Sequence, residues 1–450
     1  MTVNQDSWKV RKNNTVSEYC RRTPRSKSMY EEARKFMPGG DTRSVTYFPP
    51  YPVFMESAGG CYMKDIDGHV YLDLLSNYTA MVHGHAHPQI VEAVHQQFKK
   101  GNSYGAPCEI QTQLARHLTE RVPSIQHVRF CNSGNEATMN AIRVAKAFTG
   151  RQKLIKMEGG YHGSHDAALV SVAPLLEESG PEEAPYSVAS TNGLFQGVVD
   201  DVVVVPFNNI EATGRIFDRH AKDLAAVIIE PIMGAGGMIP ADRKYLQFLR
   251  EITRSCGALL IFDEVVSFRL SYGGAQELYE LKPDLTTLGK IIGGGFPIGA
   301  FGGRADIMAL FDPSKGRVSH SGTFNGNSAT MAGGLMSLHL LTRDEIARIN
   351  GLGERLRDAL RNVFAGLGIE MQVTGMGSVL QVHFTRNPVH DYRGTVSSRS
   401  EYSSWLHLSL LNLGMFTAGR GMVCISTAMG EKQVAEAIQG FKAAAEQLQS

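Results

Sequence analysis

The middle of the chain alternates short apolar runs with helical patterns, and this alternation restricts the fold more than any other feature. Short runs rich in β-branched and aliphatic residues occupy 153–157, 202–205, 224–229 and 258–262. Helical patterns precede the first and last of these runs, at about 135–149 and 243–255. Short buried strands separated by helices are typical of a parallel sheet that is covered on both faces. The sequence therefore predicts an α/β fold.

The two ends of the chain follow a different pattern. Strand-like runs flank Asp67-Gly68, a dipeptide that favours a tight hairpin turn. From about residue 344 a long amphipathic helix precedes further strands and a terminal helix. We expect a large domain at 80–335, and a smaller α+β domain that is built from 1–79 and 336–450.

Charge and composition exclude several classes of protein. The 45 Lys and Arg residues nearly balance 44 Asp and Glu residues, so the chain lacks the basic footprint of a nucleic-acid-binding or membrane-surface protein. No run approaches the roughly 18 uncharged apolar residues that a membrane span needs. The six scattered cysteines have no CxxC spacing and are typical of reduced thiols. We expect a cytoplasmic protein in which the basic segment 9–27 is a solvated arm rather than a targeting sequence.

The run TTLGKIIGGG at 286–295 carries the most specific chemical signal. A strand-like stretch leads to Lys290, which stands between Gly289 and three successive glycines. Glycines allow the backbone to approach a bulky group closely. A lysine that is partly desolvated has its amine available near neutral pH, and it can form a Schiff base with a carbonyl compound or with pyridoxal phosphate.

Asp263 comes directly after the apolar run 258–262. Open α/β sheets bind their ligands at the carboxyl ends of the strands. A carboxylate at such an end can keep a pyridinium nitrogen protonated. An aspartate there can also simply cap a turn, but its pairing with Lys290 favours the functional interpretation.

Two further motifs fit a flat, phosphorylated ligand. Ser133, Gly134 and Asn135 open a predicted helix, and the N-terminus of a helix favours a phosphate group. Ser133 and Glu136 also fit a capping box, which is compatible with anion binding. Tyr161, in the run GGYHG, could stack on a planar ring, although an aromatic side chain there is equally typical of core packing.

Together these motifs resemble the class III pyridoxal-phosphate-dependent aminotransferases, in the branch that contains glutamate-1-semialdehyde aminomutase. The resemblance covers the chain from about residue 36. Its matching stretches are MPGG (37–40), DIDGHVYLDL (65–74), NSGNEA (132–137), AIRVAKAFTGR (141–151), EGGYHG (158–163), AAVIIEP (225–231), FDEV (262–265), TTLGKIIGGGFPIGAFGGR (286–304) and HSGTFNGN (320–327). It implies a pyridoxal 5'-phosphate (PLP) enzyme of fold type I, whose large domain holds a mostly parallel seven-stranded sheet covered by helices.

The resemblance also implies roles for individual residues. Lys290 would form the internal aldimine with PLP and carry the proton between the substrate Cα and the cofactor C4′. Asp263 would pair with the ring nitrogen, and Val265 would pack on the ring face opposite Tyr161.

The phosphate of PLP is expected at the start of the helix that follows residue 132. The resemblance assigns it to Ser133, Gly134 and Asn135, with Thr323 supplied by the partner subunit of a homodimer whose active sites lie at the interface. Asn135 departs from the family's more usual threonine, which changes one phosphate contact. The remaining expected cofactor contacts come from His162 and Glu230.

Within this branch the sequence most resembles the aromatic β-amino acid (β-phenylalanine) aminotransferases. Arg43 matches the position that holds the carboxylate of the β-amino acid, and Arg420 matches the arginine that binds the 2-oxo acid acceptor. A guanidinium suits bidentate capture of a carboxylate. Tyr78 and Met81 could line the side-chain pocket. The implied activity is ping-pong transfer of an amino group from a small amino donor to a 2-oxo acid.

Several features leave other activities of the same scaffold open. The aminomutase motif with a glutamate before its C-terminal glycine is replaced here by AGRG at 418–421. By contrast, the long segment 164–200 is more like the gating loop of the aminomutases. Met233 and Ala235 occupy positions where relatives often have polar residues. A 2,1-aminomutase, a D-phenylglycine-type aminotransferase and a PLP racemase or lyase remain alternatives.

Other classes fit less well. A nicotinamide-dependent dehydrogenase needs G-x-G-x-x-G between a first strand and its helix, and GKIIGGG lacks that order. A non-catalytic PLP-binding regulator would carry an extra DNA-binding domain or lack the lysine. His83, His85 and His87 could in principle bind a metal ion, but they lack a neighbouring carboxylate or cysteine in the sequence, so no metal site is expected.

Overall fold

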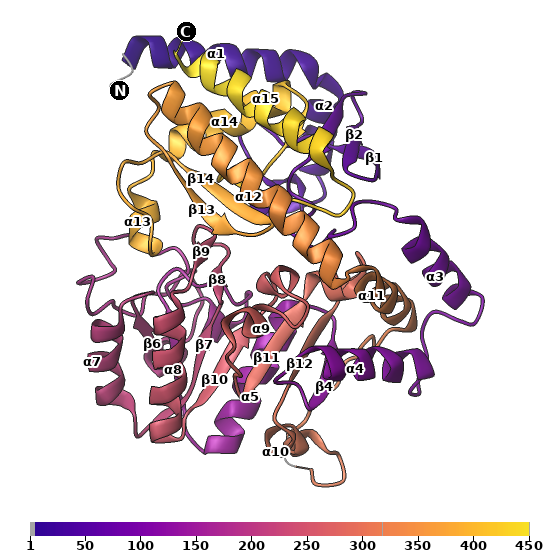
Figure 1. Ribbon diagram of the computed structural model, residues 1–450, viewed down its shortest axis with the longest axis vertical. Helices are drawn as coiled ribbons and strands as arrows, with labels where there is room; N and C mark the ends of the chain where they lie inside the picture. The colour runs from indigo at the N-terminus through magenta and orange to yellow at the C-terminus, as the bar shows by residue number, and fades with distance from the viewer. Residues whose placement is uncertain (1–4, 317, 450) are drawn as a thin grey trace. The chain divides into compact units, whose positions relative to one another are not determined.

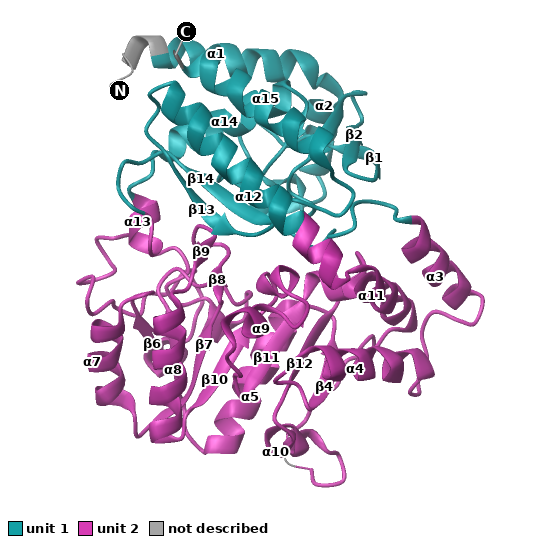
Figure 2. Cartoon of the chain, in the orientation of Figure 1, with its two compact units in different colours: residues 1–87, 349–388, 397–450 teal, residues 88–348, 389–396 magenta. Residues whose placement is uncertain are grey.

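The computed structural model describes residues 5–316 and 318–449. The chain divides into two compact units (Figure 2): unit 1 comprises 1–87, 349–388 and 397–450, and unit 2 comprises 88–348 and 389–396. The first division falls after the expected boundary at 79/80, because Gly60 and His85 exchange backbone hydrogen bonds within unit 1. The second division falls between residues 348 and 349, inside helix α12 (Arg343–Gly366) and after the expected boundary at 335/336.

Unit 2 is built on a seven-stranded sheet (Figure 1). Its strands lie in the order β4 (His127–Cys131), β12 (Gly299–Gly303), β11 (Leu285–Gly289), β10 (Leu259–Asp263), β7 (Leu224–Ile229), β5 (Lys153–Met157) and β6 (Val202–Val205). β12 pairs antiparallel with both of its neighbours, and the other pairs are parallel. The mostly parallel seven-stranded sheet of fold type I is therefore confirmed.

Both faces of this sheet are buried. Alternate strand residues such as Ala226, Ile228 and Ile261 pack in one core with α5 (Gly134–Thr149). The residues between them point to the opposite face, because side chains alternate along a strand. Val227 and Leu260 on that face are also fully buried. Burial on both sides explains why strands such as β6 and β7 have unbroken apolar sequences.

The remaining elements of unit 2 connect the strands or flank the sheet. They are α3 (Pro88–Phe98), α4 (Glu109–Arg121), α6 (Gln196–Asp201), α7 (Ile210–His220), β8 (Ile232–Met233), β9 (Ile239–Pro240), α8 (Arg243–Cys256), α9 (Ala275–Tyr279), α10 (Ala305–Met308), α11 (Ser328–Leu340) and α13 (Tyr392–Val396). The helices predicted at 135–149 and 243–255 correspond to α5 and α8.

Unit 1 is an α+β unit assembled from both ends of the chain. One sheet has the order β1 (Met55–Gly59), β2 (Tyr62–Asp65), β3 (Val70–Asp73) and β15 (Met415–Phe416), and the other has the order β13 (Gln372–Met376), β14 (Val379–His383) and β16 (Met422–Cys424). The helices are α1 (Gln5–Arg22), α2 (Pro24–Ala33), most of α12, α14 (Ser400–Asn412) and α15 (Glu431–Gln449). β2 and β3 form the hairpin that was predicted around Asp67-Gly68.

The expectation of a solvated N-terminal arm is wrong. The segment forms helix α1, which packs against α14. Tyr19 is buried and donates its hydroxyl hydrogen bond to the carbonyl oxygen of Tyr51 at 2.8 Å. Trp405 of α14 donates to Thr15 at 3.0 Å. The basic side chains of α1 are exposed or half-buried. The helix also has an apolar face, which packs on the rest of unit 1.

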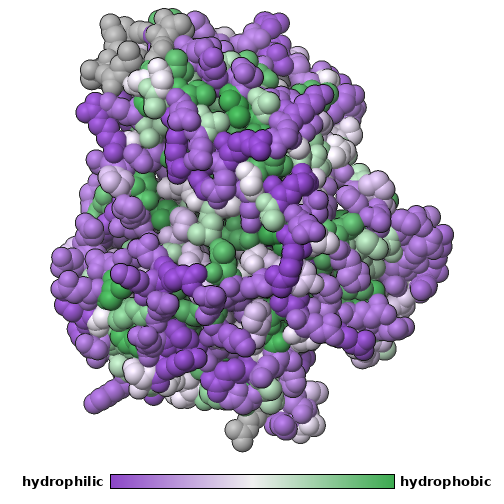
Figure 3. Space-filling model, in the orientation of Figure 1, coloured by the Kyte–Doolittle hydropathy of each residue, from purple (hydrophilic) through white to green (hydrophobic). Residues whose placement is uncertain are grey.

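The face of the protein drawn in Figure 3 is mostly hydrophilic, with apolar side chains in small groups. Among the described residues, no helix combines the length and the apolar character needed to span a bilayer. The cytoplasmic location expected from the sequence stays a prediction.

Buried His407 of α14 makes the stability of the protein depend on pH. Burial lowers the pKa of His407 to about 4 from 6.5, so the unfolded chain binds a proton in this interval and the folded chain does not. The free energy of unfolding is then expected to fall as the pH drops from 6.5 towards 4, by up to about 1.4 kcal/mol per pH unit. Thermal unfolding of His407→Phe should show a smaller loss over this range than the unchanged protein. An equal loss in both proteins would contradict this expectation.

Candidate functional site

The polar motifs of unit 2 gather at one edge of the sheet. β4, β5, β7, β10 and β11 all run in the same direction, because β12 reverses the direction between β4 and β11. Their carboxyl ends therefore lie along one edge, where open α/β sheets bind ligands. The expected site residues of this unit follow directly after these strands: Ser133, Gly134 and Asn135 after β4, Tyr161 and His162 after β5, Glu230 after β7, Asp263 and Val265 at and after β10, and Lys290 after β11.

Asp263 is held from three sides at the end of β10. Its Oδ1 accepts hydrogen bonds from the Thr287 hydroxyl of the adjacent strand at 3.1 Å and from the backbone N–H of Val265 at 3.2 Å. Its Oδ2 lies 2.8 Å from Nδ1 of His162. A carboxylate only accepts hydrogen bonds, so Nδ1 of this histidine carries the proton. The carboxylate is buried and rigid, and Oδ2 can still accept another donor.

Lys290 begins a tight turn at the end of β11. Its φ of +50° lies in the left-handed region, which is uncommon for a residue with a side chain. The preceding Gly289 lies close to Gly134 and Val265, since a Cβ at this glycine would stand 3.5 Å from atoms of both. The structure thus brings Lys290 beside the helix start and beside Val265. A lysine in an unusual backbone conformation at a strand end is typical of a functional position.

The start of α5 has the predicted capping box. The hydroxyl of Ser133 accepts a hydrogen bond from the backbone N–H of Glu136 at 3.2 Å, and the carboxylate of Glu136 accepts one from the N–H of Asn132 at 3.0 Å. Asn135 accepts a hydrogen bond through Oδ1 from the N–H of Ser164 at 2.7 Å. The amide group of Asn135 keeps its NH₂ available as a donor. The first turn therefore retains the features of an anion site.

The loop 158–163 follows β5 and carries Tyr161 and His162. The N–H of Tyr161 donates to Oε2 of Glu230 at 2.8 Å, while Oε1 of Glu230 accepts from the N–H of Gly234 at 3.0 Å. Burial raises the pKa of Glu230 above its ordinary value. Tyr161 is 45% exposed, so it is not part of the core.

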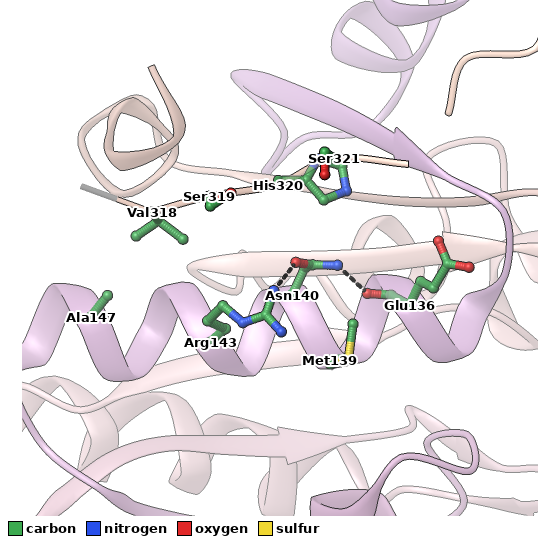
Figure 4. A pocket seen from close by; sticks show the side chains of 9 residues that line it. All are labelled: Glu136, Met139, Asn140, Arg143, Ala147, Val318, Ser319, His320 and Ser321. Carbon is green, nitrogen blue, oxygen red and sulfur yellow. Dashed lines mark hydrogen bonds between the residues drawn. The ribbon is translucent and has the colours of Figure 1, made fainter. Parts of the chain in front are cut away.

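Thr323 lies in the exposed part of the segment 318–326. This segment is tied to the helix start, because Asn132 donates a side-chain hydrogen bond to Asn325 at 2.9 Å. Residues 318–321 also form one wall of a pocket of about 500 Å³, whose other wall is α5 (Figure 4). Figure 4 shows Asn140 of α5 on the side of this wall, with the Arg143 side chain donating a hydrogen bond to it. The pocket does not include Lys290 or Asp263.

The three expected substrate residues lie together in unit 1. The guanidinium carbon of Arg43 is 5.3 Å from the ring centre of Tyr78, and that of Arg420 is 5.7 Å from the same centre. Arg43 donates to Oδ1 of Asn77 at 2.9 Å, and the hydroxyl of Tyr78 donates to the carbonyl of Val45 at 2.7 Å. Two cations thus share one aromatic ring.

The histidines of the run 83–87 have protein partners. Nδ1 of His83 lies 2.9 Å from the hydroxyl of Thr427, and Nε2 of His85 lies 2.8 Å from Oδ2 of Asp73. The ring of His87 packs edge-on against that of His83. In the part of the chain that the structure describes, no three ligand side chains are grouped so that they could hold a metal ion.

The geometry of unit 2 fits PLP. Gly134 leaves space beside Val265, since a Cβ on this glycine would stand only 3.1 Å from the valine side chain. Asp263 presents a buried carboxylate, Lys290 presents an amine, and α5 presents free N–H groups. These groups match the nitrogen, the aldehyde and the phosphate of the cofactor.

The sequence reasoning missed residues that support this site. Thr287, which fixes Asp263, stands in a matching motif, and its position two residues before the end of β11 would have indicated a role. Arg393 forms an ion pair with the buried carboxylate of Glu158 at the base of the loop 158–163. No local signal indicated this pair, because its members are 235 residues apart.

Comparisons with known proteins identify the family of the chain. The family model described as aminotransferase class-III matches residues 44–444. Glutamate-1-semialdehyde 2,1-aminomutase from Methanothermobacter thermautotrophicus is 42% identical over 394 residues, which cover 87% of this chain and 91% of the relative. An omega-transaminase from Sphaerobacter thermophilus has a TM-score of 0.92 and 44% identity, covering 94% of this chain and 98% of its own. A β-phenylalanine aminotransferase from Variovorax paradoxus has a TM-score of 0.88 and 35% identity, covering 97% and 96%. The chain belongs to the class III aminotransferases, enzymes that use PLP.

Proposed function

We propose that this enzyme transfers an amino group from an aromatic or other β-amino acid to a 2-oxo acid by a ping-pong mechanism. The observation that carries the proposal is the placement of Arg43 and Arg420 around the ring of Tyr78. Donor and acceptor both bear a carboxylate, and each must bind in turn in a ping-pong reaction. Two guanidinium groups on one aromatic ring supply two places where a carboxylate can be held.

The residues of unit 2 would hold the cofactor and move protons. When bound, PLP withdraws electrons from the substrate carbon that bears the amino group. Asp263 would keep a proton on the ring nitrogen through its fixed negative charge, and His162 would hold this carboxylate in place. The amine of Lys290 would take the proton from the substrate carbon and return it to the cofactor. Ser133, Gly134 and Asn135 would bind the phosphate.

The enzyme is further proposed to work as a homodimer in which Thr323 of one subunit reaches the phosphate bound by the other. Phe324, next to this threonine, is 59% exposed. The loop after α3, which contains exposed Tyr104, is joined to the same region by a hydrogen bond from Asn327 to the carbonyl of Asn102 at 2.9 Å. Exposed aromatic side chains on adjacent segments are typical of a protein–protein interface.

A 2,1-aminomutase is the second candidate, and the 42% identity to glutamate-1-semialdehyde 2,1-aminomutase favours it. An aminomutase moves an amino group within one molecule and needs no separate acceptor. Arg420, in the run AGRG, favours the two-substrate reaction because it offers a carboxylate site for an acceptor.

Half-reactions of the holoenzyme would separate these candidates. The enzyme is mixed with single α-, β- or ω-amino donors and the visible absorbance of the bound cofactor is followed. The proposal expects aromatic β-amino acids to change this absorbance fastest, and a 2-oxo acid to restore it. If only glutamate-1-semialdehyde reacts and no added 2-oxo acid serves as acceptor, the aminotransferase proposal is wrong and the aminomutase is favoured.

Replacing Arg43 by alanine is expected to raise the KM for the amino donor by about tenfold to hundredfold. This range corresponds to the loss of one charged hydrogen-bonded contact of about 1.5–3 kcal/mol. The KM for the 2-oxo acid should change much less. Steady-state kinetics of Arg43→Ala and Arg43→Lys test this expectation, and lysine should recover part of the loss because it keeps the charge. An unchanged donor KM in the alanine variant would remove Arg43 from the donor site.

A further inference from the structure

The C-terminal part of the chain enters unit 2 for only eight residues. Residues 389–396 belong to this unit, while the residues before and after them belong to unit 1. They include the short helix α13 (Tyr392–Val396), and its first two residues, Tyr392 and Arg393, contact the loop that follows β5.

Arg393 holds two different segments at once. It donates two hydrogen bonds to the carboxylate of Glu158, from Nε at 2.8 Å and from Nη2 at 3.0 Å. It also donates to the carbonyl oxygens of Gly180 at 3.0 Å and Ser179 at 3.2 Å. The side chain of Glu158 is only 3% exposed and that of Arg393 is 16% exposed. A bidentate pair in which the carboxylate is buried and the guanidinium partly buried restricts geometry strongly.

Tyr392 adds a second attachment of the same kind. Its hydroxyl donates to the carbonyl of Pro174 at 2.8 Å. Its side chain lies directly on Gly159, since a Cβ at this glycine would stand 2.5 Å from the Cβ of Tyr392. Gly159 also has a φ of +78°, so both its conformation and its contact with the tyrosine require a glycine.

The segment 170–190 is attached to the same loop at its base. The N–H of Gly159 donates to the carbonyl of Ser171 at 2.9 Å, and the N–H of Ser171 donates to the carbonyl of Val188 at 2.7 Å. The ammonium group of buried Lys156 donates to the carbonyl of Val170. The segment 170–190 and the loop 158–163 are therefore joined by hydrogen bonds, and residues Tyr392 and Arg393 of α13 contact both of them.

The loop 158–163 leads from this attachment to the proposed cofactor. Glu158 is its first residue, the N–H of Tyr161 is bound by Glu230, and His162 is bound to Asp263. A displacement of Glu158 would be passed along four residues to the side chain that orients Asp263. Small displacements of groups around an active site can reduce turnover by about 100-fold.

We propose that Arg393 is a positioning residue that, through Glu158, sets the geometry of the loop carrying Tyr161 and His162 and keeps the segment 170–190 fastened to this loop. The inference rests on the proposed function of that loop in holding PLP. It assigns to α13, which lies outside the matching motifs, a role in the efficiency of the reaction.

Variants of the holoenzyme test this role. Arg393→Ala should lower kcat/KM by roughly tenfold to hundredfold, change the visible circular dichroism of the bound cofactor, and increase hydrogen exchange in peptides covering 170–190. Arg393→Lys should be intermediate, because it keeps the charge but loses the fork of donors. Adding Glu158→Gln to Arg393→Ala should restore part of the activity, because it removes the buried carboxylate that the alanine leaves without its partner.

Arg215→Ala is the matched control. Arg215 pairs with Glu183 of the same segment at 3.1 Å, but the two side chains are 49% and 73% exposed. Its loss should leave activity and exchange nearly unchanged. The proposal is overturned if Arg393→Ala behaves like this control. It is also overturned if exchange increases equally throughout unit 2, which would mean that the ion pair supports only overall folding.

The outcome can be separated from a failure of the proposed function. Hydrogen exchange over 170–190 is measured without substrate, so it reports the fastening whatever the reaction is. If exchange responds to Arg393→Ala but the circular dichroism of the cofactor does not, the loop is fastened without positioning the cofactor and the proposal is wrong. If the proposed amino donors do not react in the half-reactions, the hydrogen exchange of Arg393→Ala can still be compared with that of the unchanged protein.

Discussion

Lys290→Ala is expected to lower turnover by about 10⁴-fold or more, the upper range for removal of a group that transfers protons in the reaction. The variant loses both the amine that would bind PLP covalently and the base at the end of β11. Folding should be nearly unaffected, because alanine removes side-chain atoms at a half-buried position. Single-turnover kinetics with the best amino donor measure the loss.

Lys290→Arg is the control for charge. It keeps a cation at the end of β11 but has no amine that can bind PLP covalently, so it should be as inactive as the alanine variant. Borohydride treatment followed by mass spectrometry should find PLP attached to the unchanged protein and to neither variant. Appreciable turnover by Lys290→Ala would refute the assignment of this lysine.

Asp263→Asn is expected to lower kcat by about 10²–10³-fold, the range for removal of one preorganised charge interaction in an active site. The asparagine has nearly the same shape, so it can still accept the hydrogen bonds from Thr287 and Val265. It lacks the negative charge that would keep the ring nitrogen protonated. Comparing kcat with KM shows the effect, since KM should change far less than kcat.

Thr287→Val separates the charge of Asp263 from its orientation. This substitution removes the donor 3.1 Å from Oδ1 and leaves the carboxylate charged. We expect a loss of at most about tenfold, the size of one ordinary hydrogen bond. If Asp263→Asn lowers kcat no more than Thr287→Val does, the charge of Asp263 has no special role.

Local sequence patterns were sufficient for five of the seven strands of the unit 2 sheet, but not for β4 and β12, and for much of the site. The strands β5, β6 and β7 have the predicted bounds. The unbroken aliphatic runs of β6 and β7 favour strands that are buried on both faces. The capping box at Ser133 was also predictable, since its members are three residues apart. Lys290 and Asp263 could be named because a strand end determines where the following residue lies.

Helix α14 shows where periodicity fails. Its residues from Tyr402 to Leu411 are buried on almost every side, except Ser404, so no apolar stripe distinguishes it. Helix α1 shows the opposite case. Its many charged residues suggested a solvated arm, yet Tyr19 and Trp8 dock on partners that are far away in the sequence.

The sequence by itself determined the class of fold, which polar residues follow the ends of strands, and which residues could carry PLP chemistry. Each of these depends on neighbours within a few positions along the chain. Only the tertiary structure decided what holds these residues in place. Arg393 meets Glu158 across 235 residues, and Arg43 and Arg420 meet at Tyr78. Such contacts depend on how distant segments pack together, and a residue's local sequence does not reveal which distant side chain will satisfy its charge.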